Sequence, residues 1–208
     1  MKTSIFVDAF NLYYGCLKDT PYRWLNIAEL CRVIVPDLDL EQASLKYYTA
    51  RLKARPNNPD QLYRQRRYIR ALRTLPRTEV VYGHFLTHPT TMNQEKPPHK
   101  PVRVIRTEEK GSDVNLAVDL LAGGFMELYE RAIVISNDSD LARAIKIVKE
   151  SLNIPVVVLN PHAKHPSKEL RNIATEVRHI RNSALGKSQF PRILEDDRGK
   201  FHRPGQWG

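Results

Sequence analysis

The sequence predicts an α/β protein: a Rossmann-like parallel sheet with helices on both faces, which is an α/β/α sandwich. Short apolar runs rich in β-branched residues, such as residues 131–135, are typical of parallel strands covered on both faces. Segments with apolar residues at helical spacing alternate with these runs along the chain. This alternation indicates a parallel sheet whose strands are joined by right-handed crossovers.

Length and charge set the broad class of the protein. The chain has 208 residues, 24.0 kDa and 41% hydrophobic residues, which suits one α/β domain with a short appendage. No apolar run approaches the roughly 20 residues of a membrane span, and Asp8 interrupts the apolar start of the chain. We therefore expect a cytoplasmic protein with no membrane partner. The net charge of +10 favours a polyanionic partner, such as nucleic acid.

The first part of the chain contains two predicted strands and two predicted helices. Residues 3–7 form a strand that Asp8 follows directly, and residues 43–53 form the next strand. The predicted helices cover residues 26–35 and residues 57–75, the second capped near Asn57 or Asn58.

The second predicted helix is rich in arginine. Arg66, Arg70 and Arg73 recur at spacings of four and three residues, so they share one face of the helix. Such a face is either simply solvated or contacts phosphate groups, which guanidinium groups bind bidentately.

The rest of the chain continues the alternation. The predicted strands are 79–87, 102–107, 131–135, 154–159 and 176–180; the predicted helices begin at Ser112 and cover 141–150 and 168–174; and 89–101 is an exposed loop. Residues 183–208 contain few apolar side chains and several basic ones. We expect one domain over residues 1–182 and a basic, extended or disordered arm over residues 183–208.

Four aspartates follow predicted strands or begin a predicted helix: Asp8, Asp113, Asp138 and Asp140. Each one alone is an ordinary turn or helix-capping residue. Ligands of open α/β sheets bind at the carboxyl ends of the strands, so together these residues predict a shared site. Carboxylates gather where a divalent cation neutralises them, and an all-oxygen set suits Mg²⁺ or Mn²⁺.

Asp119 differs from these residues because it lies within an almost wholly apolar stretch of the predicted helix. An ionised carboxylate there is costly unless a cation, a metal ion or several hydrogen-bond donors compensate it.

Three motifs carry a resemblance to a known family: FVDAFN, KGSDVNLAVDLL and ISNDSDL. Over about residues 1–182 the chain resembles the NYN domain, a branch of the PIN-like nuclease superfamily, and especially its LabA-like bacterial members. The resemblance implies a PIN-like fold and Mg²⁺- or Mn²⁺-dependent hydrolysis of phosphodiester bonds by an endoribonuclease. It also implies RNA, preferred over DNA, as the partner.

The resemblance assigns roles to individual residues. Asp8, Asp113, Asp138 and Asp140 would bind the metal ion and carry catalysis, and Asp119 would be a further acidic position in or beside the site. Asn11 would orient the first carboxylate or contact phosphate. The candidate substrate contacts are Lys110, Ser136, Asn137, Arg66, Arg70 and Arg73. Family members often have glycine where this chain has Ala9 and Asn137. The larger side chains of this chain would leave less room for a substrate to approach the backbone.

Other interpretations remain. A non-catalytic RNA-binding or adaptor module would keep the same fold and basic face without hydrolysis. A Toprim-like site would need a glutamate after the first strand, where this chain has Asp8, and a dinucleotide site would need a G-x-G-x-x-G motif after a strand. The oligomeric state is open between a monomer and a homodimer.

Overall fold

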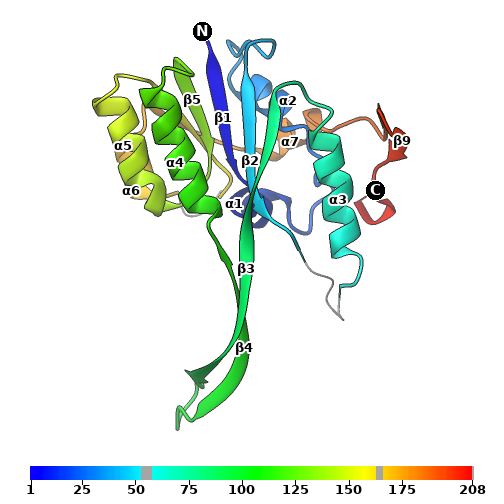
Figure 1. Cartoon of the computed structure of the whole chain (residues 1–208), viewed down its shortest axis with the longest axis vertical. Helices are drawn as coiled ribbons and strands as arrows, with labels where there is room; N and C mark the ends of the chain where they lie inside the picture. The colour runs from blue at the N-terminus through cyan, green and yellow to red at the C-terminus, as the bar shows by residue number, and fades with distance from the viewer. Residues whose placement is uncertain (53–57, 163–165, 208) are drawn as a thin grey trace.

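The computed structural model describes residues 1–52, 58–162 and 166–207. Its main sheet has seven strands in the order β4-β3-β2-β1-β5-β6-β7, and all neighbours pair in parallel except β3 and β4 (Figure 1). The strands are β1 (Thr3–Asp8), β2 (Ser44–Ala50), β3 (Thr78–Asn93), β4 (Pro101–Lys110), β5 (Arg131–Ile135), β6 (Val156–Asn160) and β7 (Glu176–His179).

Helices cover both faces of this sheet. One face packs against α4 (Ser112–Phe125), α5 (Ala142–Glu150) and α6 (Lys168–Ile173). The other packs against α1 (Ala9–Leu12), η1 (Tyr13–Leu17), α2 (Ile27–Ile34), α3 (Gln61–Leu72) and α7 (Asn182–Lys187). Every residue of β1, β5 and β6 is buried, as expected of strands covered on both sides. The predicted α/β/α class with a mainly parallel sheet is confirmed.

Among the described residues, no helix is long and apolar enough to cross a membrane.

The central strand β1 lies between β2 and β5, so the chain connections leave it in opposite directions. In open α/β sheets such a switch point opens a crevice at the carboxyl ends of the strands. Asp8 ends β1, Ser136 directly follows β5, and Asp138 lies two residues beyond Ser136. The fold therefore positions the predicted acidic residues at one edge of the sheet.

The predicted loop over residues 89–101 is wrong. β3 and β4 pair from His84 and Lys110 out to Asn93 and Pro101, and this hairpin projects from the body of the molecule as an arm (Figure 1). Pro89 is tolerated within a strand because each strand of the projecting arm has a single neighbour. The turn is confined to residues between Asn93 and Pro101.

The C-terminal segment also differs from the expected extended or disordered arm. After α7 it forms a hairpin of β8 (Ile193–Asp196) and β9 (Gly199–His202), followed by η3 (Gly205–Trp207). Phe201 and Trp207 are buried, with ring centroids 6.5 Å and 6.2 Å from that of Trp24. A few large aromatic side chains thus anchor a segment whose average composition is polar, because each buries a large area.

The boundaries of two predicted elements changed. α3 begins at Gln61, after the turn that contains Pro59, and β2 ends at Ala50. The predicted cap at Asn57 and the predicted strand end at Lys53 lie outside the described residues.

Candidate metal centre

Asp8 ends β1 and caps α1. Its Oδ1 accepts a hydrogen bond from the backbone N–H of Asn11 at 2.9 Å, and its Oδ2 accepts one from the Ser136 hydroxyl at 3.0 Å. The side chain is only 4% exposed. The pKa of Asp8 is raised to about 6, first by burial and then by the negative charges of Asp113 and Asp138, while the two hydrogen bonds oppose the rise. Asp8 is therefore oriented by donors yet still poorly compensated as an anion.

Asp138 follows β5 in a tight turn stabilised by its neighbours. Its backbone N–H donates to the Ser136 hydroxyl at 3.0 Å, and its Oδ1 accepts from the backbone N–H of Asp140 at 3.0 Å. The side chain caps the 3-10 turn η2 (Ser139–Leu141), as a capping residue would. Ser136 therefore connects the Asp8 carboxylate to the turn that holds Asp138.

Asp113 lies in the first turn of α4, whose start is set by Glu109. The backbone N–H and the hydroxyl of Ser112 donate to the Glu109 carboxylate at 3.1 Å and 2.6 Å. Gly111 precedes the helix with φ 95°, a left-handed conformation that favours glycine. Burial raises the pKa of Asp113, and Asp138 and Glu109 add to the rise. Glu109 thus satisfies a backbone N–H at the start of α4.

The three carboxylates converge. One oxygen each from Asp8, Asp113 and Asp138 lie within 4.8 Å of one another, although the residues come from β1, α4 and the turn after β5. Three anionic oxygens this close repel one another. Hard oxygen donors at this spacing fit a divalent cation such as Mg²⁺ or Mn²⁺.

A sequence profile of the NYN domain matches residues 2–181. The chain belongs to the NYN domain family. This family is part of the PIN-like nuclease superfamily, so the family suggested by the three sequence motifs is confirmed.

Two further comparisons place this NYN domain among known proteins. It is 28% identical over 236 residues to a Pseudomonas putida protein named 6-hydroxy-3-succinoylpyridine 3-monooxygenase, covering 100% of this chain and 75% of that protein. A crystal structure of a protein of unknown function from Vibrio parahaemolyticus matches with a TM-score of 0.56 at 19% identity, covering 90% of this chain and 95% of that one. The match to the Vibrio parahaemolyticus structure shows a similar fold and nothing about activity.

Two asparagine side chains hydrogen-bond to the backbone of the loops next to the carboxylates. The Asn11 side-chain oxygen accepts from the backbone N–H of Asn137 at 2.9 Å, and the Asn137 side-chain oxygen accepts from the backbone N–H of Ser167 at 2.7 Å. Asn11 thus orients Asp8 through its backbone N–H, while its side chain ties the start of α1 to the turn after β5. The predicted contacts of Asn11 and Asn137 with a substrate stay predictions.

The structure contradicts the assignment of Ser136 as a substrate contact. Ser136 is fully buried, and its hydroxyl donates to Asp8 and accepts from the backbone of Asp138. A hydroxyl without exposed surface is not available to a substrate. Ser136 instead holds two of the three acidic residues in place.

Asp119 does not belong to the acidic cluster. Its carboxylate accepts hydrogen bonds from Lys46 Nζ and from the Tyr48 hydroxyl of β2, both at 2.9 Å. These partners compensate a carboxylate in an apolar stretch, so the predicted metal role is wrong. Asp119 attaches α4 to the sheet.

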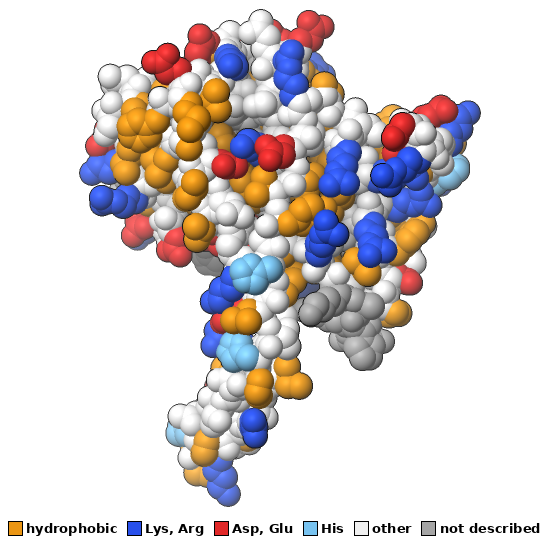
Figure 2. All heavy atoms as spheres, viewed as in Figure 1, with side chains coloured by type: hydrophobic (Ala, Val, Ile, Leu, Met, Phe, Trp, Pro, Cys, Tyr) orange, Lys and Arg blue, Asp and Glu red, His pale blue; other side chains and the backbone are white. Residues whose placement is uncertain are grey.

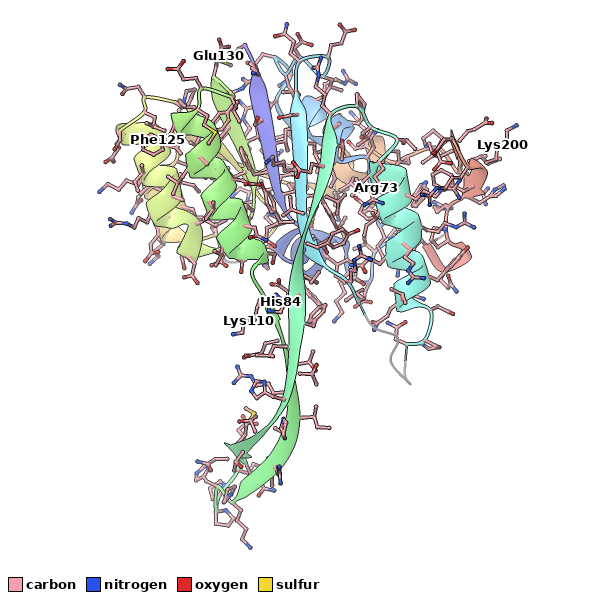
Figure 3. The ribbon with its side chains drawn as sticks, viewed as in Figure 1. Arg73, His84, Lys110, Phe125, Glu130 and Lys200 are labelled. Carbon is pink, nitrogen blue, oxygen red and sulfur yellow. The ribbon has the colours of Figure 1, made fainter. Side chains whose placement is uncertain are left out.

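Arg70 is also engaged elsewhere. Its guanidinium donates to the Asp196 carboxylate, with Nε to Oδ2 at 2.8 Å, and stacks over the Phe201 ring at 4.1 Å. The predicted phosphate contact is therefore wrong for Arg70, which fastens the C-terminal hairpin to α3. Arg66 and Arg73 are exposed, and Figure 3 shows Arg73 toward the end of α3 that is remote from the β3–β4 arm.

Asp140 and Lys110 border the centre. Asp140 is exposed and lies outside the group of three, but it is among the charges that raise the pKa of Asp113. Lys110 ends β4, and its ammonium lies 3.2 Å from a carboxylate oxygen of Glu108. Their roles in metal and phosphate binding stay predictions.

Glu109 is the residue near the centre that sequence reasoning missed. Its carboxylate fits beside Gly83 of β3, where a Cβ atom would lie 2.4 Å from Glu109 Oε1. Only the pairing of β3 with β4 brings these residues together. The local motif EKGSD contains Glu109 but gives no sign of that pairing.

Proposed function

We propose that this NYN domain is a metal-dependent endonuclease that hydrolyses phosphodiester bonds of single-stranded RNA. The observation that carries the proposal is the convergence of Asp8, Asp113 and Asp138 in a member of a nuclease-type family. The net charge of +10 supports a polyanionic substrate.

The chain supplies both the ligands and their support. Asp8, Asp113 and Asp138 would hold Mg²⁺ or Mn²⁺, Ser136 and the backbone of Asn11 fix Asp8, and Glu109 fixes the helix that carries Asp113. The bound ion would supply Lewis-acid chemistry, polarising a phosphoryl oxygen and neutralising the charge that develops on it.

The remaining predicted residues would act on the substrate. Lys110 would neutralise a phosphate next to the site, and the exposed Asp140 would be a further carboxylate for the metal ion. Arg66 and Arg73 would contact phosphates without reading base identity, because phosphate contacts carry no sequence information.

Cleavage of labelled single-stranded RNA tests the proposal. With Mg²⁺ or Mn²⁺ the wild type should cut, and Asp138→Asn should lower the rate at least about 100-fold because the ion loses one of its carboxylates. Asp119→Asn is the matched control: it removes the same charge from α4 outside the cluster and should retain cleavage. RNA binding without cleavage, in the presence of any divalent ion, would instead support the non-catalytic adaptor.

The Pseudomonas putida relative raises a second candidate, hydroxylation of a pyridine ring, because the similarity extends over 100% of this chain. Monooxygenation needs dioxygen and an electron donor, since one oxygen atom enters the ring and the other is reduced to water. A cluster of three carboxylates fits hydrolysis with a hard cation better than oxygen chemistry at iron, which commonly uses two histidines and one carboxylate. Dioxygen consumption with 6-hydroxy-3-succinoylpyridine, in the absence of RNA cleavage, would favour this candidate.

A further inference from the structure

The outer face of α4 is an exposed apolar surface. Val114, Val118 and Phe125 are 65%, 55% and 64% exposed, and their spacings of four and seven residues put them on one side of the helix. Met126 and Leu128 extend this surface beyond the helix and are also exposed. Figure 2 shows hydrophobic side chains gathered over α4. Contiguous apolar surface of this kind marks an interaction site.

One face of the β3–β4 arm carries exposed apolar side chains next to the charged side chains of Arg106, Glu108 and Lys110. The antiparallel register puts Leu86, Met92 and Val102 on the same face as His84 and Lys110, because directly paired residues and every second residue share a face. These three apolar side chains are 47%, 47% and 37% exposed. An isolated two-stranded hairpin is marginally stable in water, so a partner surface is expected to cover it.

The two surfaces are related by the geometry of the chain. β4 ends at Lys110 and α4 begins at Ser112, and from this junction the arm and the helix run in opposite directions (Figure 1). Figure 3 labels His84 and Lys110 at the base of the arm, and Phe125 on α4. A two-fold axis in front of this junction would therefore lay the arm of one chain on α4 of another, and the reverse.

The lengths agree with this arrangement. The 14 residues of α4 span about 21 Å at about 1.5 Å per residue. From His84 to Met92 the arm extends about 26 Å at about 3.3 Å per residue. Met92 and Val102 of one chain would thus lie beside Phe125 of the other.

We propose that this NYN domain forms a two-fold homodimer in which each β3–β4 arm packs along the apolar face of α4 of the other chain. Charge supports a second copy as the partner. The exposed Lys96 and Lys100 at the tip of the arm would lie beside the exposed Glu127 and Glu130 at the far end of α4. RNA is the less suitable occupant of α4, because it would leave the exposed apolar side chains of that helix uncovered.

The dimer would bring the two metal centres together. Asp113 lies two residues from Gly111, next to the two-fold axis, so the acidic clusters of both chains would flank the interface. This inference goes beyond the proposed nuclease function and does not depend on it.

Sedimentation equilibrium without RNA or divalent ions tests the proposal. The wild type should have the mass of two chains, and Phe125→Asp and Leu86→Asp should each have the mass of one, with unchanged circular dichroism. Ile105→Asp is the matched control, because Ile105 is 78% exposed on the opposite face of the same arm and its variant should stay a dimer.

A disulfide between the two surfaces provides an independent measurement. The double variant Met92→Cys with Phe125→Cys should oxidise to a covalent dimer, whereas Ile105→Cys with Phe125→Cys should not. A monomeric wild type, or dimers that survive both Phe125→Asp and Leu86→Asp, would overturn the proposal. So would a monomer in which Leu86→Asp weakens RNA binding, which would assign the arm to nucleic acid.

Discussion

Asp8 carries a buried charge that the fold orients but does not neutralise. Its two hydrogen bonds, from the backbone of Asn11 and from Ser136, oppose the effect of burial, yet its pKa still lies at about 6. Asp113 and Asp138 add like charge within 4.8 Å. At neutral pH without a cation, this arrangement lowers the stability of the fold, as expected of a site organised for binding rather than for packing.

Removing one of these charges should therefore stabilise the metal-free protein. Two like charges about 4 Å apart repel by about 1 kcal/mol in water and by about 4 kcal/mol at the effective dielectric of a protein surface. For a domain of this size, about 1 kcal/mol shifts the melting temperature by about 2 to 4 °C. Asp113→Asn should raise the melting temperature in chelator, measured by differential scanning calorimetry.

Adding Mn²⁺ should reverse the order of the melting temperatures, so that the wild type melts above Asp113→Asn. Binding to the folded state alone should raise the melting temperature of the wild type and leave that of Asp113→Asn nearly unchanged. Asp119→Asn should behave oppositely, with a lower melting temperature from the lost Lys46 contact and a retained response to Mn²⁺. Equal responses of all three proteins would contradict a metal site at Asp113.

Sequence reasoning at this scale succeeded where a residue acts through its place at a strand end. Asp8 and Asp138 were expected at one site because the carboxyl ends of parallel strands share an edge, and Asp113 was added as an acidic residue at a helix start. Asp119 was misassigned because its partners, Lys46 and Tyr48, lie on a strand far away in sequence and meet it only through packing. Arg70 was misassigned for the same reason, since Asp196 and Phe201 come from the other end of the chain.

One ion pair fastens the C-terminal hairpin to α3. Asp196 ends β8 and pairs with Arg70, whose guanidinium group lies over the ring of Phe201 in β9. The hydrogen bond from Arg70 lowers the pKa of Asp196 to about 2 from an ordinary value of 3.8. Because the folded-state pKa lies below the ordinary value, the ionised form of Asp196 stabilises the fold.

The stability from this pair should depend on pH in a defined window. Its contribution is complete above the ordinary pKa of 3.8 and is lost as the pH falls through about 2. The difference in unfolding free energy between the wild type and Asp196→Asn should therefore narrow from pH 5 to pH 2, as measured by urea unfolding. A difference that is constant over this range would show that the charge of Asp196 contributes nothing.

At the scale of the whole molecule, local sequence patterns predicted the central sheet correctly. They did not predict the β3–β4 arm or the folded C-terminal segment. The buried strands and the helices between them were predicted because apolar periodicity is a property of neighbouring residues. The outer part of the arm, residues 89–101, was expected to be a loop because its strands pair only with each other and have no buried face to give them an apolar pattern. The C-terminal segment was expected to be extended because its burial depends on Trp24, near the start of the chain.

The architecture combines these parts into one arrangement around the carboxyl edge of the sheet. β1 and β5 deliver Asp8 and Asp138, and the junction of the arm with α4 delivers Asp113. The same junction is where the proposed dimer axis lies. A substrate would therefore approach the metal centre beside the arm and, in the dimer, close to the second chain.

A crystal of the protein soaked in Mn²⁺, with anomalous diffraction recorded, tests the central claim most directly. The account predicts one or two manganese peaks bound by the carboxylates of Asp8, Asp113 and Asp138, with no peak at Asp119. Manganese bound elsewhere, or carboxylates turned away from one another with no ion between them, would contradict it.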